Sequence, residues 1–135
     1  MDEAANKEII RRAFEDWAAG RGGVFDLLAD DAIWIIVGNS VAAGTYNGRA
    51  EFLDRVIHPF NARLSSPLVP RVRAIYADGD TVIAYFDASA TARDGRPYEN
   101  TYTWYLRLQD GEITRATAFF DSIEFNEFWA RVAPS

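Results

Sequence analysis

The sequence predicts an α+β fold in which helices cover one side of a curved antiparallel sheet. Three Asp-Gly pairs separate four β-rich runs in the second half of the chain, as in a series of hairpins. Amphipathic helical patterns open and close the sequence. The length of 135 residues suits a single domain over residues 1–135 that is large enough to bury a core.

The first half of the chain is predicted to be mainly helical. Apolar residues recur at helical spacing from Ile10 to Trp17, between a candidate N-cap at Asp2 and a glycine at Gly20 that suits a helix end. Another helix is expected after Asn47-Gly48, with a kink or an end near Pro59. The other predictions are a short helix over residues 24–29 that is ended by Asp30-Asp31, a strand over residues 32–37, and loops over residues 38–44 and 61–67.

The second half is predicted to be a four-stranded antiparallel meander. The Asp-Gly pairs that begin at Asp78, Asp94 and Asp110 are typical of tight turns between paired strands. The strands are expected over residues 68–77, 81–92, 98–109 and 112–122, and a last helix begins at about residue 123. A long curved sheet with helices on one side forms a cup, and the interior of a cup needs large side chains as its lining.

Composition excludes several classes of function. The chain lacks cysteine, which excludes disulfides, thiolate zinc sites and cysteine nucleophiles. Its 20 acidic and 14 basic residues give a formal charge of −6, so nucleic acid is not an expected partner. No apolar run approaches the roughly 20 residues of a membrane span, and the acidic start does not resemble a secretory signal. We therefore expect a cytoplasmic protein that does not contact a membrane.

Aromatic residues are more numerous than a small core requires. Nine Phe, six Tyr and four Trp make up 14% of the chain. They form either a bulky solid core or the wall of a hollow one, and the composition leaves both interpretations open. His58 is the only histidine, and a single histidine is a poor basis for a metal site. We therefore expect neither a metal nor a cofactor, so that any chemistry depends on carboxylates, hydroxyls and amides.

Two aspartates are the candidate acid–base groups. Asp87 lies in the middle of a predicted strand, where aspartate is disfavoured, and Asp121 directly follows Phe119-Phe120. Two carboxylates that share an apolar cavity acquire different pKa values, as acid–base catalysis near neutral pH requires. The alternative is structural. Asp87 then pairs with Arg115 or Arg107, and Asp121 caps the last helix, with Glu124 at capping-box spacing.

Short motifs over nearly the whole chain carry a resemblance to a known family. They are Leu28-Ala29-Asp30-Asp31-Ala32, Tyr46-Asn47-Gly48-Arg49, Asp110-Gly111-Glu112-Ile113 and Phe119-Phe120-Asp121. In these motifs and in its order of elements the sequence resembles the nuclear-transport-factor-2-like superfamily, and within it the SnoaL-like and ketosteroid-isomerase-related group. The resemblance implies a cone-shaped, cystatin-like α+β fold, a deep apolar pocket and a homodimer formed across the sheet.

The resemblance also allows catalytic residues of known family members to be compared with this sequence one position at a time. The base and the two oxyanion-binding groups of ketosteroid isomerase fall at Ile36, at Ala13 or Phe14, and at Trp104, and none of these residues can fill those roles. The polyketide cyclases of the SnoaL type use one aspartate as general acid–base, and that role falls on Asp121.

Limonene epoxide hydrolase is a closer local match from the second meander strand onward. Its two catalytic aspartates fall on Asp87 and Asp121, but its arginine falls on Tyr85. Its water-holding residues fall at about Trp34 and Ile36. The resemblance therefore keeps the acid–base pair of that enzyme and loses its bridging cation and its water site.

The leading hypothesis is a cofactor-independent cyclase, isomerase or lyase that acts on a small apolar carbonyl compound. Asp121 is its expected general acid–base and Asp87 a second carboxylate that tunes it. The alternatives are a non-catalytic ligand-binding or dimerisation module, for which Thr101, Thr103 and Tyr105 offer a mild strand face, and an epoxide hydrolase. The expected hydrogen-bonding residues are Tyr85, Asn100 and Tyr102, and the expected pocket wall consists of Trp17, Trp34, Phe60, Trp104 and Phe119.

Overall fold

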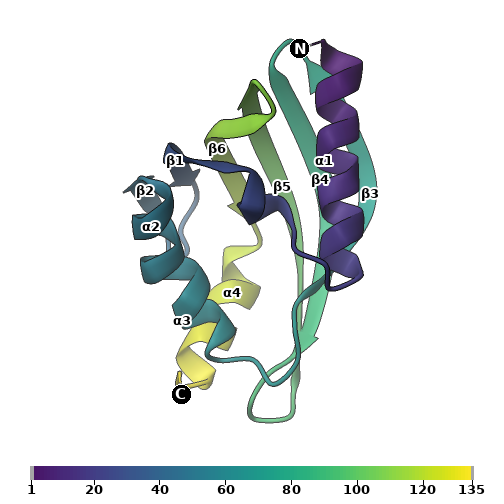
Figure 1. Cartoon of the computed structure of the whole chain (residues 1–135). Coiled ribbons are helices and arrows are strands. Elements are labelled where there is room, and N and C mark those ends of the chain that lie inside the picture. Colours follow the sequence, from purple (N-terminus) through teal and green to yellow (C-terminus); the bar gives the residue numbers. More distant parts are fainter. Residues whose placement is uncertain (1, 135) are drawn as a thin grey trace.

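Six strands form one curved sheet in the computed structural model, which describes residues 2–134 (Figure 1). The strands are β1 (Leu28–Ile36), β2 (Gly44–Asn47), β3 (Val69–Asp78), β4 (Thr81–Thr91), β5 (Pro97–Gln109) and β6 (Glu112–Phe120). Their order across the sheet is β2-β1-β6-β5-β4-β3, and only the β1–β6 pair is parallel. The predicted α+β class and the antiparallel meander of β3 to β6 are confirmed. Met1 and Ser135, the two ends of the expected domain, lie outside the described residues.

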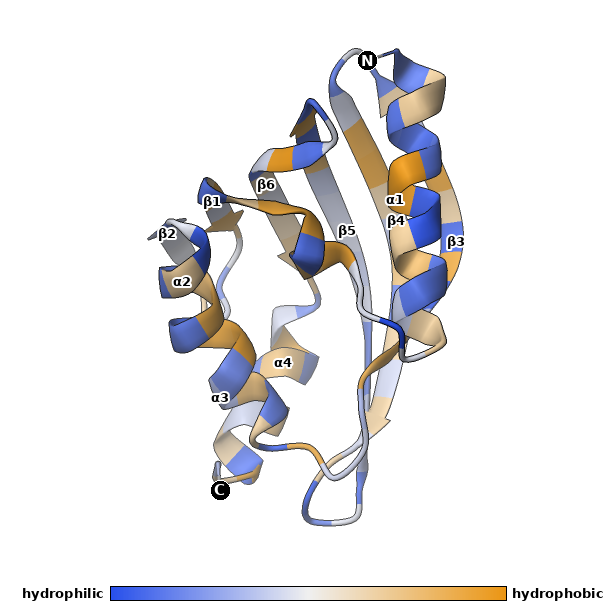
Figure 2. Ribbon diagram, in the orientation of Figure 1, coloured by the Kyte–Doolittle hydropathy of each residue, from blue (hydrophilic) through white to orange (hydrophobic). Residues whose placement is uncertain are grey.

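The helical segments stand on one side of this sheet and leave a space between them. They are α1 (Glu3–Ala18), the 3₁₀ turn η1 (Val24–Leu27), α2 (Arg49–Phe52), the π-helical turn η2 (Leu53–Ile57), α3 (His58–Asn61) and α4 (Ser122–Arg131). In Figure 1, α1 and the α2–η2–α3 segment form opposite walls, and η1 crosses between them in front of the sheet. In Figure 2 the helices alternate between hydrophilic and hydrophobic residues along their length, as elements with one buried face do.

Helix α1 forms as the sequence predicts. The side chain of Asp2 accepts a hydrogen bond of 2.7 Å from the backbone N–H of Ala5, which satisfies one of the free donors at the helix start. Ile10 and Phe14 of its apolar stripe are buried against the sheet. Gly20 follows the helix end with a φ of 75°, a conformation that favours glycine.

The second helical wall is continuous from α2 to α3, but it contains one wide turn. The backbone N–H of His58 bonds to the carbonyl of Leu53, five residues earlier, so η2 is a π-turn. Pro59 follows directly and lacks the N–H that an α-helical bond requires. The irregularity expected near Pro59 is therefore present as a widened turn. This π-turn lies in the α2–η2–α3 segment, which is one of the two helical walls.

The first strand pair differs from the prediction. The short helix expected over residues 24–29 is only the η1 turn, and β1 begins at Leu28 and runs through Asp30-Asp31. Both aspartates are exposed, and the β1–β6 register shifts between Leu28 and Ile33, so they lie at an irregularity rather than at a strand end. Strand β2, at the sheet edge, was not predicted. It begins at Gly44, the last residue of the predicted loop, and ends at Asn47.

The inner face of the meander is apolar and aromatic. In β4 up to Ala88 and throughout β5 the even-numbered residues are buried, among them Phe86, Tyr102 and Trp104. In β6 the register against β5 shifts beside Arg107, and Ala116, Ala118 and Phe120 face inward after it. Strand β3 forms the other edge of the sheet, and its pairing with β4 is interrupted between Val72 and Ala74.

Candidate functional site

A cavity of about 680 Å³ lies between the sheet and its two helical walls. Its volume lies within the range of roughly 300–1,000 Å³ that is usual for small-molecule sites. Exposed residues on the lining, such as Asp26, Asn61 and Ser65, mark its opening. The larger lining side chains are Trp17, Phe25, Trp34, Ile36, Phe52, Val56, Ile57, Phe60, Leu64, Leu68, Tyr102, Trp104, Phe120 and Phe125.

The cavity wall is built from interlocked aromatic rings. Trp34 stacks on Phe52 with ring centroids 4.3 Å apart, and its edge meets Trp104 at 5.1 Å. The indole N–H of Trp17 donates to the carbonyl of Leu68 at 2.9 Å, which fixes that ring at the opening. Of the predicted wall residues, Trp17, Trp34, Phe60 and Trp104 line the cavity, as does the predicted hydrogen-bonding residue Tyr102.

One buried polar network reaches this apolar wall. The Asn100 amide donates to the Tyr98 hydroxyl at 2.8 Å and to the backbone carbonyl of Asp121 at 3.0 Å. The amide oxygen of Asn100 accepts from the N–H of Thr101 at 2.8 Å, so the orientation of the side chain is fixed. The Tyr98 and Tyr102 hydroxyls share a hydrogen bond of 2.7 Å. Tyr102, the last member, lines the cavity, whereas Asn100 is buried behind it.

Both tyrosines of this network are neutral hydroxyl groups near neutral pH. Burial raises the pKa of Tyr98 to about 12, against the opposing effect of its bonds to Tyr102 and Asn100. Burial also raises the pKa of Tyr102 well above its ordinary value. Each hydroxyl therefore keeps its hydrogen, and the network can present a donor to the cavity.

Asp87 does not face the cavity, and that part of the sequence interpretation is wrong. Its neighbours Phe86 and Ala88 point inward, so strand alternation places Asp87 on the outer face of the sheet. There it accepts from the Arg73 guanidinium at 2.7 Å and from the Thr101 hydroxyl at 2.7 Å. These bonds, that of Arg73 first, lower its pKa to about 2. An arginine pair is what the structural alternative expects, but the partners are Arg73 and Arg71 and not Arg107 or Arg115.

Asp121 also points away from the cavity. It is the N-cap of α4, and its carboxylate accepts from the backbone N–H groups of Ile123 at 2.9 Å and Glu124 at 3.4 Å. Asp121 is exposed and is not part of the cavity lining. The expected pair of carboxylates in one cavity is therefore absent, because one lies on the outer face and the other caps a helix.

Three further predicted site residues lie outside the lining. Tyr85 is on the outer face with its hydroxyl accepting from Arg73 at 3.0 Å, and Phe119 is 53% exposed on the same side of the sheet. Asn100 faces inward but reaches the cavity only through the tyrosines. His58 is exposed, with its Nδ1 atom 3.3 Å from Asp54, and it also lies outside the lining.

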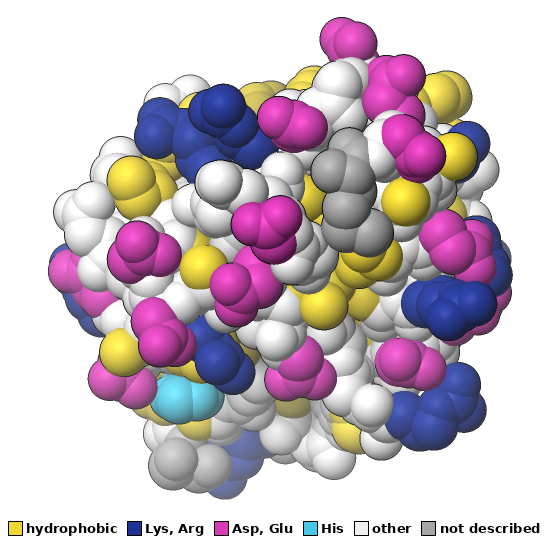
Figure 3. Space-filling view, turned by 45° about the horizontal axis from the view of Figure 1, so that its top comes forward, with side chains coloured by type: hydrophobic (Ala, Val, Ile, Leu, Met, Phe, Trp, Pro, Cys, Tyr) yellow, Lys and Arg dark blue, Asp and Glu magenta, His cyan; other side chains and the backbone are white. Residues whose placement is uncertain are grey.

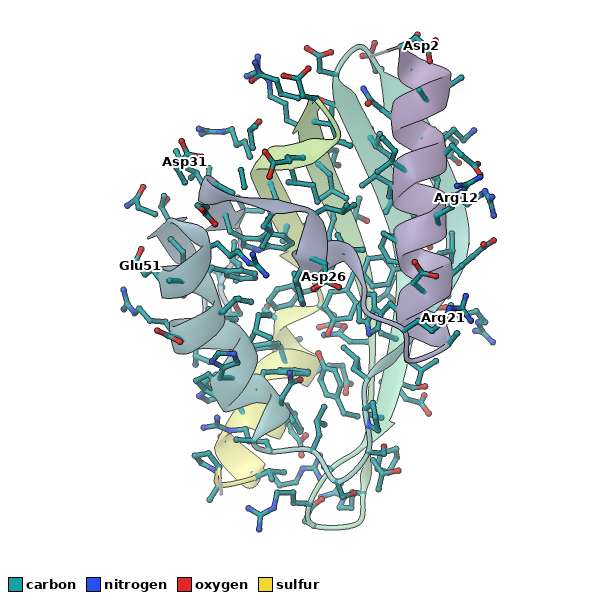
Figure 4. All side chains as sticks on the ribbon, in the orientation of Figure 1. Asp2, Arg12, Arg21, Asp26, Asp31 and Glu51 are labelled. Atoms are coloured by element: carbon teal, nitrogen blue, oxygen red, sulfur yellow. The ribbon has the colours of Figure 1, made fainter. Side chains whose placement is uncertain are left out.

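Sequence reasoning missed one charged residue of the site. Asp26 on η1 lines the cavity, and it is the single Asp, Glu, Lys, Arg or His among the described lining residues. Figure 4 shows it on the segment that crosses between the two helical walls. Its carboxylate accepts from the N–H of Gly23 at 3.0 Å. No periodic pattern marks such a residue, since it joins the site only when the α1–β1 connection folds across the sheet.

The remaining charges are distributed over the surface. In Figure 3, acidic side chains are spread over the visible face, with basic side chains in small groups among them. Within residues 2–134 no group of three or more His, Asp or Glu side chains is placed to hold a metal ion. None of the helices in that part of the chain is long and apolar enough to cross a membrane.

A comparison with known protein families identifies the family to which this fold belongs. The model of the SnoaL-like domain matches residues 10–116, which is most of the chain. The chain belongs to the SnoaL-like family. The predicted resemblance is thereby confirmed. A search among proteins with curated functions found no match to this SnoaL-like chain.

Solved structures share the SnoaL-like fold over nearly the full length. Bal32a, from a soil-derived mobile gene cassette, superposes with a TM-score of 0.75 and 20% identity over 95% of this chain and 99% of that one. TerC, co-crystallised with polyporic acid, gives a TM-score of 0.73 and 22% identity over 93% and 98%. A protein from Jannaschia assigned as a SnoaL-like polyketide cyclase gives 0.72 and 16% over 95% and 93%.

The positions that the sequence resemblance aligns with catalytic residues of two enzymes are occupied here by apolar or outward-facing residues. Ile36 and Trp104, which the sequence resemblance aligns with two catalytic positions of ketosteroid isomerase, belong to the apolar lining of this SnoaL-like cavity. Asp87 and Tyr85, which the sequence resemblance aligns with an aspartate and the arginine of the epoxide hydrolase, lie together on the outer face. The interior of this cavity consequently offers one neutral network, at Tyr102, instead of a carboxylate pair.

Proposed function

We propose that the protein binds a planar, mostly apolar carbonyl compound in this cavity, and that Tyr102 donates a hydrogen bond to its carbonyl oxygen. The network of Asn100, Tyr98 and Tyr102 carries the proposal. In this proposal, Trp17, Trp34, Phe60 and Trp104 provide flat apolar surfaces for the rings of the ligand.

The direction of the bond between the tyrosines follows from the cost of an unpaired hydrogen. The Asn100 amide already donates to Tyr98, so Tyr98 is free to donate to Tyr102. If Tyr102 donated instead, the hydroxyl hydrogen of buried Tyr98 would have no partner within the described residues. A buried donor without a partner costs roughly 1–3 kcal/mol. The favoured arrangement therefore leaves the Tyr102 hydrogen available to the cavity.

A hydroxyl in such a position favours a ligand with an acceptor oxygen. A neutral donor aimed at a carbonyl stabilises the negative charge that builds up on its oxygen during enolisation or aldol closure. This chemistry is the part of the cyclase or isomerase hypothesis that the cavity residues support. The acid–base pair of that hypothesis is not part of the proposal, because neither Asp87 nor Asp121 belongs to the lining. For the same reason epoxide hydrolysis is not proposed.

The test is equilibrium dialysis with two ligands of nearly equal shape, methyl naphthyl ketone and isopropenylnaphthalene. We expect Tyr102→Phe to weaken binding of the ketone about five- to tenfold, which corresponds to one lost hydrogen bond. Binding of the hydrocarbon should not change. Tyr85→Phe is the matched control, since it removes a tyrosine hydroxyl on the outer face. An equal loss for both ligands, or no loss for either, would contradict the role of Tyr102.

We also propose that two copies pair through the outer face of the sheet. Tyr105 and Phe119 are 43% and 53% exposed there, and neighbouring exposed apolar side chains can mark an interaction surface. Arg107 lies directly opposite Arg115 in the β5–β6 pairing, and none of the ion pairs within residues 2–134 includes either.

Charge complementarity favours a second copy as the partner. Glu99 and Arg107 lie on the same face of β5, four residues to either side of Thr103. A two-fold axis near Thr103 would bring Arg107 of one copy close to Glu99 of the other, and the reverse contact would form as well. The pairing relieves the repulsion between Arg107 and Arg115, which face each other with like charge.

A further inference from the structure

The opening of the cavity carries one uncompensated negative charge. Asp26 accepts a hydrogen bond from Gly23 through one carboxylate oxygen, and it takes part in no ion pair within the described residues. Arg21, five residues earlier, pairs with Asp16 at 3.1 Å instead. The other polar residues at the opening, Asn61 and Ser65, are neutral. A ligand that enters therefore passes a carboxylate without a neighbouring cation.

Aromatic rings of the cavity lining also attract positive charge. The Phe25 ring, next to Asp26 in sequence, lies 5.6 Å from Trp34 and 5.7 Å from Trp104 between ring centroids. Trp17 lies 6.4 Å from the same ring. The faces of aromatic rings attract cations within about 6 Å of their centres, and tryptophan does so best. The carboxylate and these rings line the same cavity, and both favour a positively charged group.

We propose that the ligand carries a protonated or quaternary nitrogen at the end that lies beside Asp26. This inference rests on the proposed function, because it adds a second contact to a ligand whose carbonyl is held at Tyr102. The ligand class is then an aryl carbonyl compound with an amine at the opposite end of its ring system. An anionic group at that end is disfavoured, since it would be desolvated beside a carboxylate and π faces.

The alternative role of Asp26 is to hold the η1 turn through its bond to Gly23. Asp26→Asn separates the two roles. The amide oxygen can still accept from the Gly23 N–H, whereas the charge is lost. Glu112→Gln removes an equal charge at the β5–β6 turn, outside the cavity lining, and is the matched control.

The test compares two derivatives of methyl naphthyl ketone in equilibrium dialysis at neutral pH. One carries a dimethylaminomethyl group at the far end of the ring system, and the other carries the isobutyl group of the same shape. We expect the wild-type protein to bind the amine more tightly than its neutral counterpart. Asp26→Asn should weaken amine binding about fivefold, the upper range for an exposed ion pair, and should leave the isobutyl compound unaffected. Glu112→Gln should change neither affinity.

The outcomes separate this inference from the proposed function. If both compounds bind with Tyr102 dependence but Asp26→Asn affects them equally, the cation site is wrong and the carbonyl site stands. If a carboxymethyl derivative binds as tightly as the amine, the cation site is also wrong. If none of the compounds binds to the wild-type protein, the proposed function fails, and this inference fails with it.

Discussion

Asp87 connects three strands on the outer face through side-chain hydrogen bonds. It lies on β4, its partner Arg73 on β3 and its partner Thr101 on β5. Mid-strand aspartate is disfavoured in general because its carboxylate competes for backbone hydrogens. Here a guanidinium and a hydroxyl satisfy it instead, so the residue that looked most unusual in the sequence has a structural explanation.

The contribution of Asp87 to stability should depend on pH in one direction. Its pKa of about 2 in the folded chain lies below the ordinary 3.8, so folding favours the ionised form. The stabilisation is then complete above about pH 4 and is lost as the pH falls through 2. Thermal unfolding should give Asp87→Asn a midpoint a few degrees below wild type at neutral pH, and the difference should vanish near pH 2. A constant difference across that range would contradict this account.

Asp121 should behave as a helix cap and not as a catalytic acid. Replacement by alanine is expected to cost about 1 kcal/mol of unfolding free energy, because the Ile123 N–H loses its acceptor. Asp121→Ser should recover most of that loss, since serine is also a good N-cap. Urea denaturation measures both variants. Wild-type stability in the alanine variant together with loss of ligand binding would favour the acid–base role instead.

Strand alternation explains which site residues could be predicted. It grouped Tyr102 and Trp104 correctly, because a long regular strand fixes which side chains share a face. The same alternation puts Asp87 on the face opposite Phe86 and Ala88, so its expected place in the cavity is wrong. Asp26 carries no periodic signal at all, because its place at the opening depends on how a short connection crosses the sheet.

At the scale of elements, one arginine joins the second helical wall to the C-terminal helix. The Arg63 guanidinium lies 3.8 Å from the centre of the Trp129 ring and donates to the backbone carbonyls of Pro59 at 2.8 Å and Trp129 at 3.2 Å. Burial lowers the pKa of Arg63, which has no carboxylate partner within residues 2–134. The contact holds α4 against the loop that follows α3.

Arg63→Met should weaken this junction while keeping the volume of the side chain. We expect a loss of about 1–3 kcal/mol, because two hydrogen bonds and a cation–π contact disappear together. Chemical denaturation measures the loss, and Arg96→Met, at an exposed position, serves as the control with little expected change. Equal stability of the two variants would show that α4 is held by its apolar face alone.

The elements with strong patterns were predictable, and those with weak patterns were not. Helix α1 has a cap and an apolar stripe, and the meander strands are separated by Asp-Gly turns. Strand β2 has only four residues, of which Tyr46 alone is buried, so no alternation reveals it. Asp30-Asp31 looked like a break, but exposed aspartates are tolerated where a strand is irregular.

At the scale of the whole molecule, the proposed pairing of two copies can be tested by exchanging charges. Sedimentation equilibrium should give wild type twice the 15.2 kDa mass of the chain. Arg107→Glu places two acids at the same contact and should weaken association at least tenfold, because close like charges cost several kcal/mol at an interface.

The double exchange is the decisive control. Arg107→Glu combined with Glu99→Arg reverses the charges at both contacts and should restore the dimer if the two residues meet across the axis. A wild-type protein that sediments as a single 15.2 kDa chain at micromolar concentration would contradict the pairing. A dimer that is indifferent to both exchanges would place its interface elsewhere.

The interrupted register of β3 limits the form that any larger assembly can take. A free edge strand offers backbone groups to further chains, and a flat edge invites open-ended growth into filaments. Here the outer edge at β3 bends between Val72 and Ala74, and Pro70 beside it lacks a backbone donor. The opposite edge, β2, is four residues long. Neither edge is a good template for continuous strand addition, which agrees with the proposed pairing through the face of the sheet.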